Sequence, residues 1–240
     1  MRLLLDFLAR FGWGLAAGLV ITSPAAVTAG FFRVNSLVIM GLATFAALLA
    51  PAAGGAWPLP AAAAVTAWLA SVAWLGEKRR PGLALVAVTA LLMGVATVLA
   101  AGGSTGSPAV FGALLSGLVV GLTVHAMLLG HWYLNAPGMS VAALRRAIDQ
   151  ALAAWAACLL VALVVETPRL AASWRTADAA TLALAALRWL AGLVGLPVLL
   201  IMARQTLDIP NTQSATGILY VACLAAILGE LTAQLLAAAT

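Results

Sequence analysis

The chain has 240 residues, of which 65% are hydrophobic and 8% are charged, with a formal net charge of +5 and a mean hydropathy of +1.12. Soluble domains carry about 25% charged residues, so this composition excludes a soluble globular protein. Apolar runs of about 20 residues recur along the whole chain, whereas the alternating segments of about ten residues that mark an outer-membrane barrel do not occur. We therefore predict an all-α, polytopic integral membrane helix bundle that forms a single transmembrane domain over residues 1–240.

Glycine, proline and charged residues divide the chain into eight expected helices, with seven as the alternative count. The expected ranges are 4–33, 36–52, 58–76, 82–101, 108–134, 140–166, 178–205 and 215–239. Asp6 and Arg10 interrupt the first apolar stretch, which therefore indicates a transmembrane helix rather than a signal peptide. Ser23 followed by Pro24 predicts a break within that helix.

Basic residues are distributed unevenly between the two sides of the predicted bundle. The loops after odd-numbered helices carry seven of them, namely Arg33, Lys78, Arg79, Arg80, Arg145, Arg146 and Arg204. The other side carries four, namely Arg2, Arg10, Arg169 and Arg175. The positive-inside rule then predicts a multi-pass protein of the bacterial inner (cytoplasmic) membrane with the odd loops, including Lys78–Arg80, in the cytoplasm. The basic charge marks orientation rather than nucleic-acid binding.

Residues 1–107 and 108–240 show weak internal sequence similarity. At an offset of 100 residues the identical pairs include Phe11/Phe111, Gly12/Gly112, Leu15/Leu115, Val20/Val120, Gly30/Gly130 and Asn35/Asn135. Chance identities are frequent in so biased a composition. A four-plus-four helix repeat is therefore a hypothesis.

Polar residues gather at one predicted membrane face, because the fifth helix ends on the side where the seventh and eighth helices turn. The residues expected there as a quinone-type or ligand-binding site are His131, Tyr133, Asn135, Arg204, Gln205, Asp208, Asn211 and Gln213. A quinone head needs hydrogen-bond donors for its two carbonyls and a titrating group near water, which these side chains supply. An ordinary belt of interfacial aromatic and polar residues is the competing interpretation.

A second polar level lies near the middle of the membrane. Antiparallel pairing places His125 level with Gln150 and Arg188 level with Glu230, roughly 15 Å from a surface at 1.5 Å per residue. A lone charge at this depth costs at least ~2.5–3.5 kcal/mol, so we expect Arg188 and Glu230 to face the interior and each other. A structural ion pair and a proton or substrate path both remain open, and His125 is more often a packing residue than a ligand.

Conventional enzyme and metal sites are not indicated. The two histidines lie six residues apart on one predicted helix, and Cys158 and Cys223 are far apart, so we expect no haem and no metal. The chain also lacks a glycine-rich phosphate loop and an HExxH motif.

The leading hypothesis is an integral membrane subunit of a multi-subunit respiratory or redox complex, which forms or supports a quinone-type site. Membrane lipid and other subunits that carry the redox centres are then its partners, and the chain is a non-catalytic anchor rather than a free-standing enzyme. The alternative is a small-solute or proton-coupled transporter or channel that uses Arg188 and Glu230. A lipid- or prenyl-directed enzyme with His131 and Asp208 as acid and base ranks last, and a purely structural assembly subunit also stays open.

Overall fold

The computed structural model describes residues 1–102, 108–136, 138–168, 177–209 and 211–239, and over these ranges it is helical with no strand. Eight helical spans in these ranges are long and apolar enough to cross a membrane, which confirms a polytopic helical bundle. The elements in chain order are α1 (Arg2–Ile21), α2 (Ala29–Leu49), η1 (Pro51–Ala53), α3 (Pro58–Leu75), α4 (Arg79–Ala100), α5 (Pro108–Asn135), α6 (Ala142–Val161), η2 (Ala162–Glu166), α8 (Ala179–Leu187), η3 (Arg188–Gly195), α9 (Leu196–Thr206) and α10 (Thr212–Ala239). Arg169 and Arg175, which the orientation count used, lie outside the described residues.

The expected ranges agree with the structure from the third helix onward, but the first two are wrong. The chain leaves the first helix at Ile21, and Thr22 adopts an extended backbone with φ −82° and ψ 128°. Pro24 follows and has no backbone N–H to donate. A second extended residue, Thr28, precedes α2, so the break between the two helices is a connection rather than a kink within one helix.

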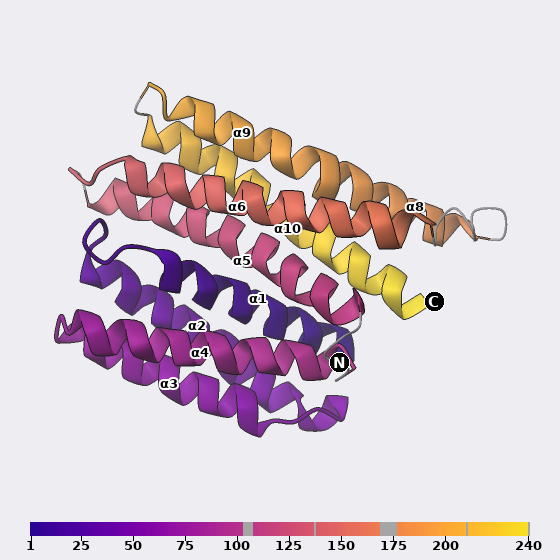
Figure 1. The fold of residues 1–240 in the computed structure, drawn as a ribbon, viewed down its shortest axis with the longest axis horizontal. Helices are drawn as coiled ribbons and strands as arrows, with labels where there is room; N and C mark the ends of the chain where they lie inside the picture. The colour runs from indigo at the N-terminus through magenta and orange to yellow at the C-terminus, as the bar shows by residue number, and fades with distance from the viewer. Residues whose placement is uncertain (103–107, 137, 169–176, 210, 240) are drawn as a thin grey trace.

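The helices form two groups that meet along α1 and α5 (Figure 1). In the first group α1 packs against α2 and α4, and in the second α5 packs against α6 and α10. Both chain ends lie at the same end of the bundle (Figure 1). The four-plus-four repeat stays a hypothesis, because Asn35 lies near the start of α2 whereas Asn135 is the last residue of α5.

Glycines bring α1 and α5 into backbone contact. A Cβ atom added at Gly14 would lie 1.9 Å from the carbonyl oxygen of Gly117, and one at Gly121 would lie 2.1 Å from the carbonyl carbon of Gly14. Small residues allow membrane helices to approach in this way, where dispersion contacts replace the hydrophobic drive of water. The two groups are therefore joined by a crossing that admits no side chain.

The outer surface of the bundle is apolar. Large hydrophobic side chains such as Leu48, Val164, Leu190 and Leu224 are exposed along the spans. In a membrane such a surface contacts lipid tails rather than water, so membrane lipid is the surroundings of this chain.

The seventh span widens in its middle. It passes from α8 into the π-helical segment η3 before it resumes as α9. Pro197 near the start of α9 has no N–H, and its ring crowds the carbonyl four residues earlier, which accounts for the wide turn before it. Within η3, a Cβ added at Gly192 would lie 2.8 Å from the Cα of Gly229 on α10. This contact brings Arg188, the first residue of η3, close to Gly229, the residue before Glu230.

Candidate functional site

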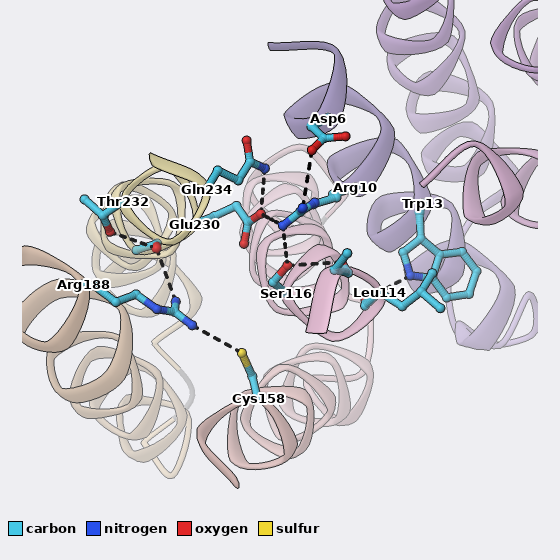
Figure 2. Close-up of polar contacts among 12 residues, drawn as sticks. Asp6, Arg10, Trp13, Leu114, Ser116, Cys158, Arg188, Glu230, Thr232 and Gln234 are labelled. Atoms are coloured by element: carbon cyan, nitrogen blue, oxygen red, sulfur yellow. Dashed lines mark hydrogen bonds and ion pairs between the residues drawn. The ribbon is translucent and has the colours of Figure 1, made fainter. Parts of the chain in front are cut away.

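A partly buried ionic cluster joins α1, α5 and α10 (Figure 2). Arg10 Nη1 lies 2.8 Å from Glu230 Oε1, and Gln234 Nε2 donates to the same oxygen at 2.7 Å. Arg10 Nη1 also donates to Ser116 Oγ at 3.4 Å, and Arg10 Nη2 lies 3.5 Å from Asp6 Oδ2. One arginine thus bridges two carboxylates and a hydroxyl.

The cluster occupies one depth in the bundle. Arg10 and Ser116 each follow the start of their helices by eight residues, and Arg188 follows the start of α8 by nine. Glu230 precedes the end of α10 by nine residues. At 1.5 Å per residue these positions lie about 12–14 Å from the bundle end that carries both chain termini. Charges at this depth need partners within the protein.

Arg188 and Glu230 face the interior as expected, with 5% and 2% of their surface exposed. The ion pair of Glu230 is with Arg10, however, whereas the sequence predicted Arg188. The Glu230 side chain turns toward α1, while Arg188 Nη1 donates to the carbonyl of the preceding residue, Gly229, at 3.2 Å. Arg188 Nη2 donates to Cys158 Sγ on α6 at 3.7 Å.

A small cavity lies between this cluster and α6. Its lining residues are Ser116, Val119, Val120, Trp155, Cys158, Arg188, Gly192, Leu193, Leu196, Ala226 and Glu230. The volume open to the centre of a water molecule is about 10 Å³, which is room for about one water.

Two lining residues of this cavity carry buried polar atoms that have no hydrogen-bond partner within the described parts of the chain. They are Glu230 Oε2, an acceptor when ionised, and Trp155 Nε1, a donor. Most buried polar atoms in native proteins have a hydrogen-bond partner, and a water or another polar occupant of the cavity would supply one to these two.

Three of the residues predicted to bind a ligand lie at the far end of α5, where they bind neighbouring protein groups. His131 Nδ1 lies 3.2 Å from the Tyr220 hydroxyl on α10. The buried Tyr133 donates its hydroxyl hydrogen to the carbonyl oxygen of Ser140. Asn135 Nδ2 donates to the carbonyl of His131 at 3.4 Å.

The predicted residues around the turn between α9 and α10 also have structural partners. Arg204 pairs with Asp149 on α6, and Asp208 accepts a hydrogen bond from Arg145 Nη2 at 3.0 Å. Asn211 Oδ1 accepts from the backbone N–H three residues later at 2.9 Å and so caps the start of α10. These contacts tie α6, α9 and α10 together.

Gln205 and Gln213, the last two residues of the predicted site, are exposed at the same end of the bundle. The structure thus places all eight predicted residues at one end, as their sequence positions imply. Most of them connect helices or cap them.

His125 contacts α1. It is fully buried, and its Nε2 lies 2.8 Å from Thr22 Oγ1, which itself donates to the Gly18 carbonyl. This chain of contacts assigns the ring hydrogen to Nε2, because the Thr22 hydroxyl hydrogen is already used. Phe31 packs edge-on against the ring at 5.5 Å between centroids. The arrangement is typical of a packing histidine, and its expected neighbour Gln150 is half-buried on α6.

Sequence reasoning missed Arg10 as a site residue because it was assigned to the orientation charges. Two signals could have identified it. It lies eight residues inside the first helix, and Asp6 precedes it by four residues, on the same helix face. Trp155 had no such signal, since a tryptophan in an apolar helix ordinarily packs.

Among the described residues no group of three or more His, Cys, Asp or Glu side chains could hold a metal ion. No protein-family model matches this chain, and neither a curated protein nor a solved structure matches it. The chemistry open to it follows from its own residues, and the described ones form a partly buried charge cluster, with polar atoms that lack partners, within a bundle of eight candidate membrane spans.

Proposed function

We propose that this chain is a transporter of a small solute in which Glu230 carries the coupling proton. The observation that supports the proposal is the environment of this carboxylate. Glu230 is 2% exposed and lines the cavity, one of its oxygens binds Arg10 and Gln234, and the other has no hydrogen-bond partner among the described residues. Ionisable side chains inside membrane spans are costly, and they commonly mark ion pathways and proton relays.

The cluster can accommodate either protonation state of Glu230. When a proton binds to Oε2, the carboxyl becomes neutral and Arg10 retains Asp6 at 3.5 Å as its ionic partner. When the proton leaves, Arg10 pairs with Glu230 at 2.8 Å. A purely structural ion pair is the competing interpretation, but such a pair is most stable when every buried oxygen has a donor. The unpaired Oε2 favours a carboxylate that takes up a proton.

Dicyclohexylcarbodiimide, an apolar reagent that modifies protonated carboxyl groups, tests this proposal without knowledge of the solute. The full chain in lipid vesicles is treated over a range of pH, and modified peptides are identified by mass spectrometry. We expect an adduct on Glu230 that increases as the pH falls. Glu77, which is exposed between α3 and α4, serves as the internal control for a water-facing carboxylate. An unmodified Glu230 at every pH would overturn the proposal.

Flux measurements provide the second readout. Vesicles that contain the protein and a trapped pH-sensitive dye should take up protons when the transported solute is supplied. Glu230→Gln keeps the size and the hydrogen bonds of the side chain but cannot release a proton, so it should abolish this uptake. Uptake that is unchanged in Glu230→Gln would assign the proton to another group.

We also propose that the chain lies in a bacterial inner membrane with the odd-numbered loops in the cytoplasm. The sequence count assigned Arg10 to the membrane side opposite Lys78. Because Arg10 forms an ion pair inside the bundle, it does not count as a loop charge there, and the excess of basic residues on the Lys78 side increases. A Lys78→Cys variant labelled with a membrane-impermeant maleimide tests this orientation. Labelling of intact cells would place Lys78 outside and reverse the topology.

A quinone-type site in a respiratory or redox complex is the second candidate function. The observation that favours it is the pair of His131 and Tyr220, a titratable ring and a hydroxyl, both exposed at one end of α5 and α10. Partner subunits would supply the redox centres. Organic extraction of the purified protein tests this candidate, and it fails if neither a quinone nor a redox partner is recovered.

A further inference from the structure

We propose that the cavity beside Glu230 binds a small inorganic anion of halide size, and that Arg188 and the Trp155 indole N–H are its ligands. This inference rests on the transporter proposed above and names the class of its solute: an anion that enters together with the proton on Glu230.

The donors around the cavity have the chemistry of an anion site. The Arg188 guanidinium lines it and carries a permanent positive charge with hydrogen-bond donors only. Trp155 Nε1 can only donate, and it has no partner within the described residues. Hydrogen bonds from such groups to an ionised acceptor are about twice as strong as those between neutral groups. A cation would instead require a set of oxygen ligands, which the Arg188 guanidinium and the Trp155 indole do not provide.

The walls and the size of the cavity restrict the ligand. Its remaining lining is mostly aliphatic, with Val119, Val120, Leu193 and Leu196 among the residues. The open volume of about 10 Å³ admits about one water-sized particle. Organic acids and phosphate exceed this space, whereas fluoride fits it and chloride requires only a slight widening. An apolar wall also removes water from the ion, so its charge interacts more strongly with the guanidinium.

Protonation of Glu230 and binding of the anion favour each other. When Glu230 is ionised, its unpaired Oε2 places a negative charge at the cavity and repels an anion. After protonation the carboxyl is neutral, its O–H can donate into the cavity, and the cluster has gained one positive charge. One proton and one monovalent anion then enter together, and the charges balance. By linkage, the anion raises the affinity for the proton by the same factor by which the proton raises the affinity for the anion.

Equilibrium binding of radioactive chloride, with fluoride as the competitor, tests the inference on the full-length purified protein. Between pH 8.5 and 5.5 we expect the apparent chloride affinity to rise by up to tenfold per pH unit, because one proton accompanies one anion. Glu230→Gln should bind chloride with an affinity that does not change with pH.

Trp155→Phe removes the N–H and keeps an aromatic ring in place. A hydrogen bond to a charged group contributes about 1.5–3 kcal/mol, so the variant should bind chloride at least about tenfold more weakly. Trp68→Phe is the matched control, since Trp68 is exposed on the outer surface of α3, and it should bind as the wild type does.

The outcomes separate this inference from the proposed function. If no chloride or fluoride binds at pH 5.5 while the carbodiimide still modifies Glu230, the cavity holds only water and the anion site is refuted, whereas the proton site stands. Chloride binding that is insensitive both to pH and to Trp155→Phe places the ion elsewhere and also refutes the inference. An unmodified Glu230 refutes the proton site itself.

Discussion

The backbone contact between α1 and α5 predicts that a single methyl group at Gly121 destabilises the whole bundle. The added Cβ would lie 2.1 Å from the carbonyl carbon of Gly14 and 2.2 Å from the backbone nitrogen of Leu15. Ordinary van der Waals contact begins at 3.4 Å, so the two helices must separate by roughly 1.3 Å to accept the methyl group. The obstructing atoms are backbone, so no side-chain rotation can relieve the clash.

The expected cost of Gly121→Ala follows from overpacking, which typically destabilises a well-packed interior by about 1–3 kcal/mol. The change from glycine to alanine also adds helix propensity, by up to about 1 kcal/mol. Gly41→Ala is the matched control, because its Cβ would meet nothing within 4 Å on the helix α2. Both variants gain the same propensity, so the difference between their free energies of unfolding isolates the overpacking, about 1–3 kcal/mol.

Unfolding of the purified protein in mixed micelles with increasing dodecyl sulfate, followed by far-ultraviolet circular dichroism, measures this difference. A second readout is the ionic cluster, since Arg10 on α1 reaches Ser116 on α5 at 3.4 Å, a distance that a wider helix separation would lengthen. We therefore also expect the pH dependence of carbodiimide modification at Glu230 to change in Gly121→Ala. If Gly121→Ala proves as stable as Gly41→Ala, the close crossing of α1 and α5 is wrong.

Three further predictions concern the cluster and the ends of the helices. Arg10→Gln leaves Glu230 as a buried charge without its ionic partner and should destabilise the protein by about 3–5 kcal/mol in the same unfolding assay. Adding Glu230→Gln to this variant should restore part of the lost stability. A double variant as unstable as Arg10→Gln alone would contradict the ion pair. Gly54→Ala should destabilise by about 1–2 kcal/mol through the backbone alone, because Gly54 has φ 71° and no atom within 4 Å of an added Cβ. Hydrogen bonds from the Thr181 side chain and backbone hold the pKa of Asp178 below its usual value of 3.8, so its contribution to stability is full above that pH and is lost as the pH falls through the lower, folded-state pKa. The stability difference between the wild type and Asp178→Asn, measured from pH 6 to pH 3, should therefore shrink toward the acid end, and a difference that grows would contradict this sign.

Helix periodicity and hydropathy were sufficient to predict the fold class and most of the spans, because each apolar run must be long enough to cross the hydrocarbon. They failed at the first connection, where residues 22–28 (TSPAAVT) are few and uncharged, so no charge marks where one helix ends and the next begins. The Ser23-Pro24 pair indicated a break, but it could not show whether the chain bends or leaves the helix. The extended backbone at Thr22 and Thr28 shows that the chain leaves the helix there. As a result, α2 begins at Ala29, earlier in the chain than the expected residue 36.

The site was predictable only in part. The insertion cost of charge correctly indicated that Arg188 and Glu230 face the interior. The sequence prediction compared the membrane depth of polar residues only between helices adjacent in sequence. It therefore paired Glu230 with Arg188 of the preceding span. With an even number of spans both termini lie on one side, so the same comparison between the first and last helices places Arg10 level with Glu230. That Trp155 Nε1 has no partner among the described residues could not be predicted at all, because it depends on how α6 packs against α5 and α9.

The position of Glu230 relates its protonation to the arrangement of the two helix groups. Arg10 belongs to the first group and Glu230 to the last helix of the second, so their ion pair crosses between the groups. The glycine contact of α1 with α5 crosses between them as well, but it contains no titratable atom. In the proposed cycle, a proton on Glu230 weakens its ion pair with Arg10 and leaves the glycine contact between α1 and α5 unchanged. A motion coupled to protonation is therefore expected at α10 relative to α1, with the crossing at Gly14 and Gly121 as its fixed point, and this motion would change access to the cavity that Glu230 shares with Arg188.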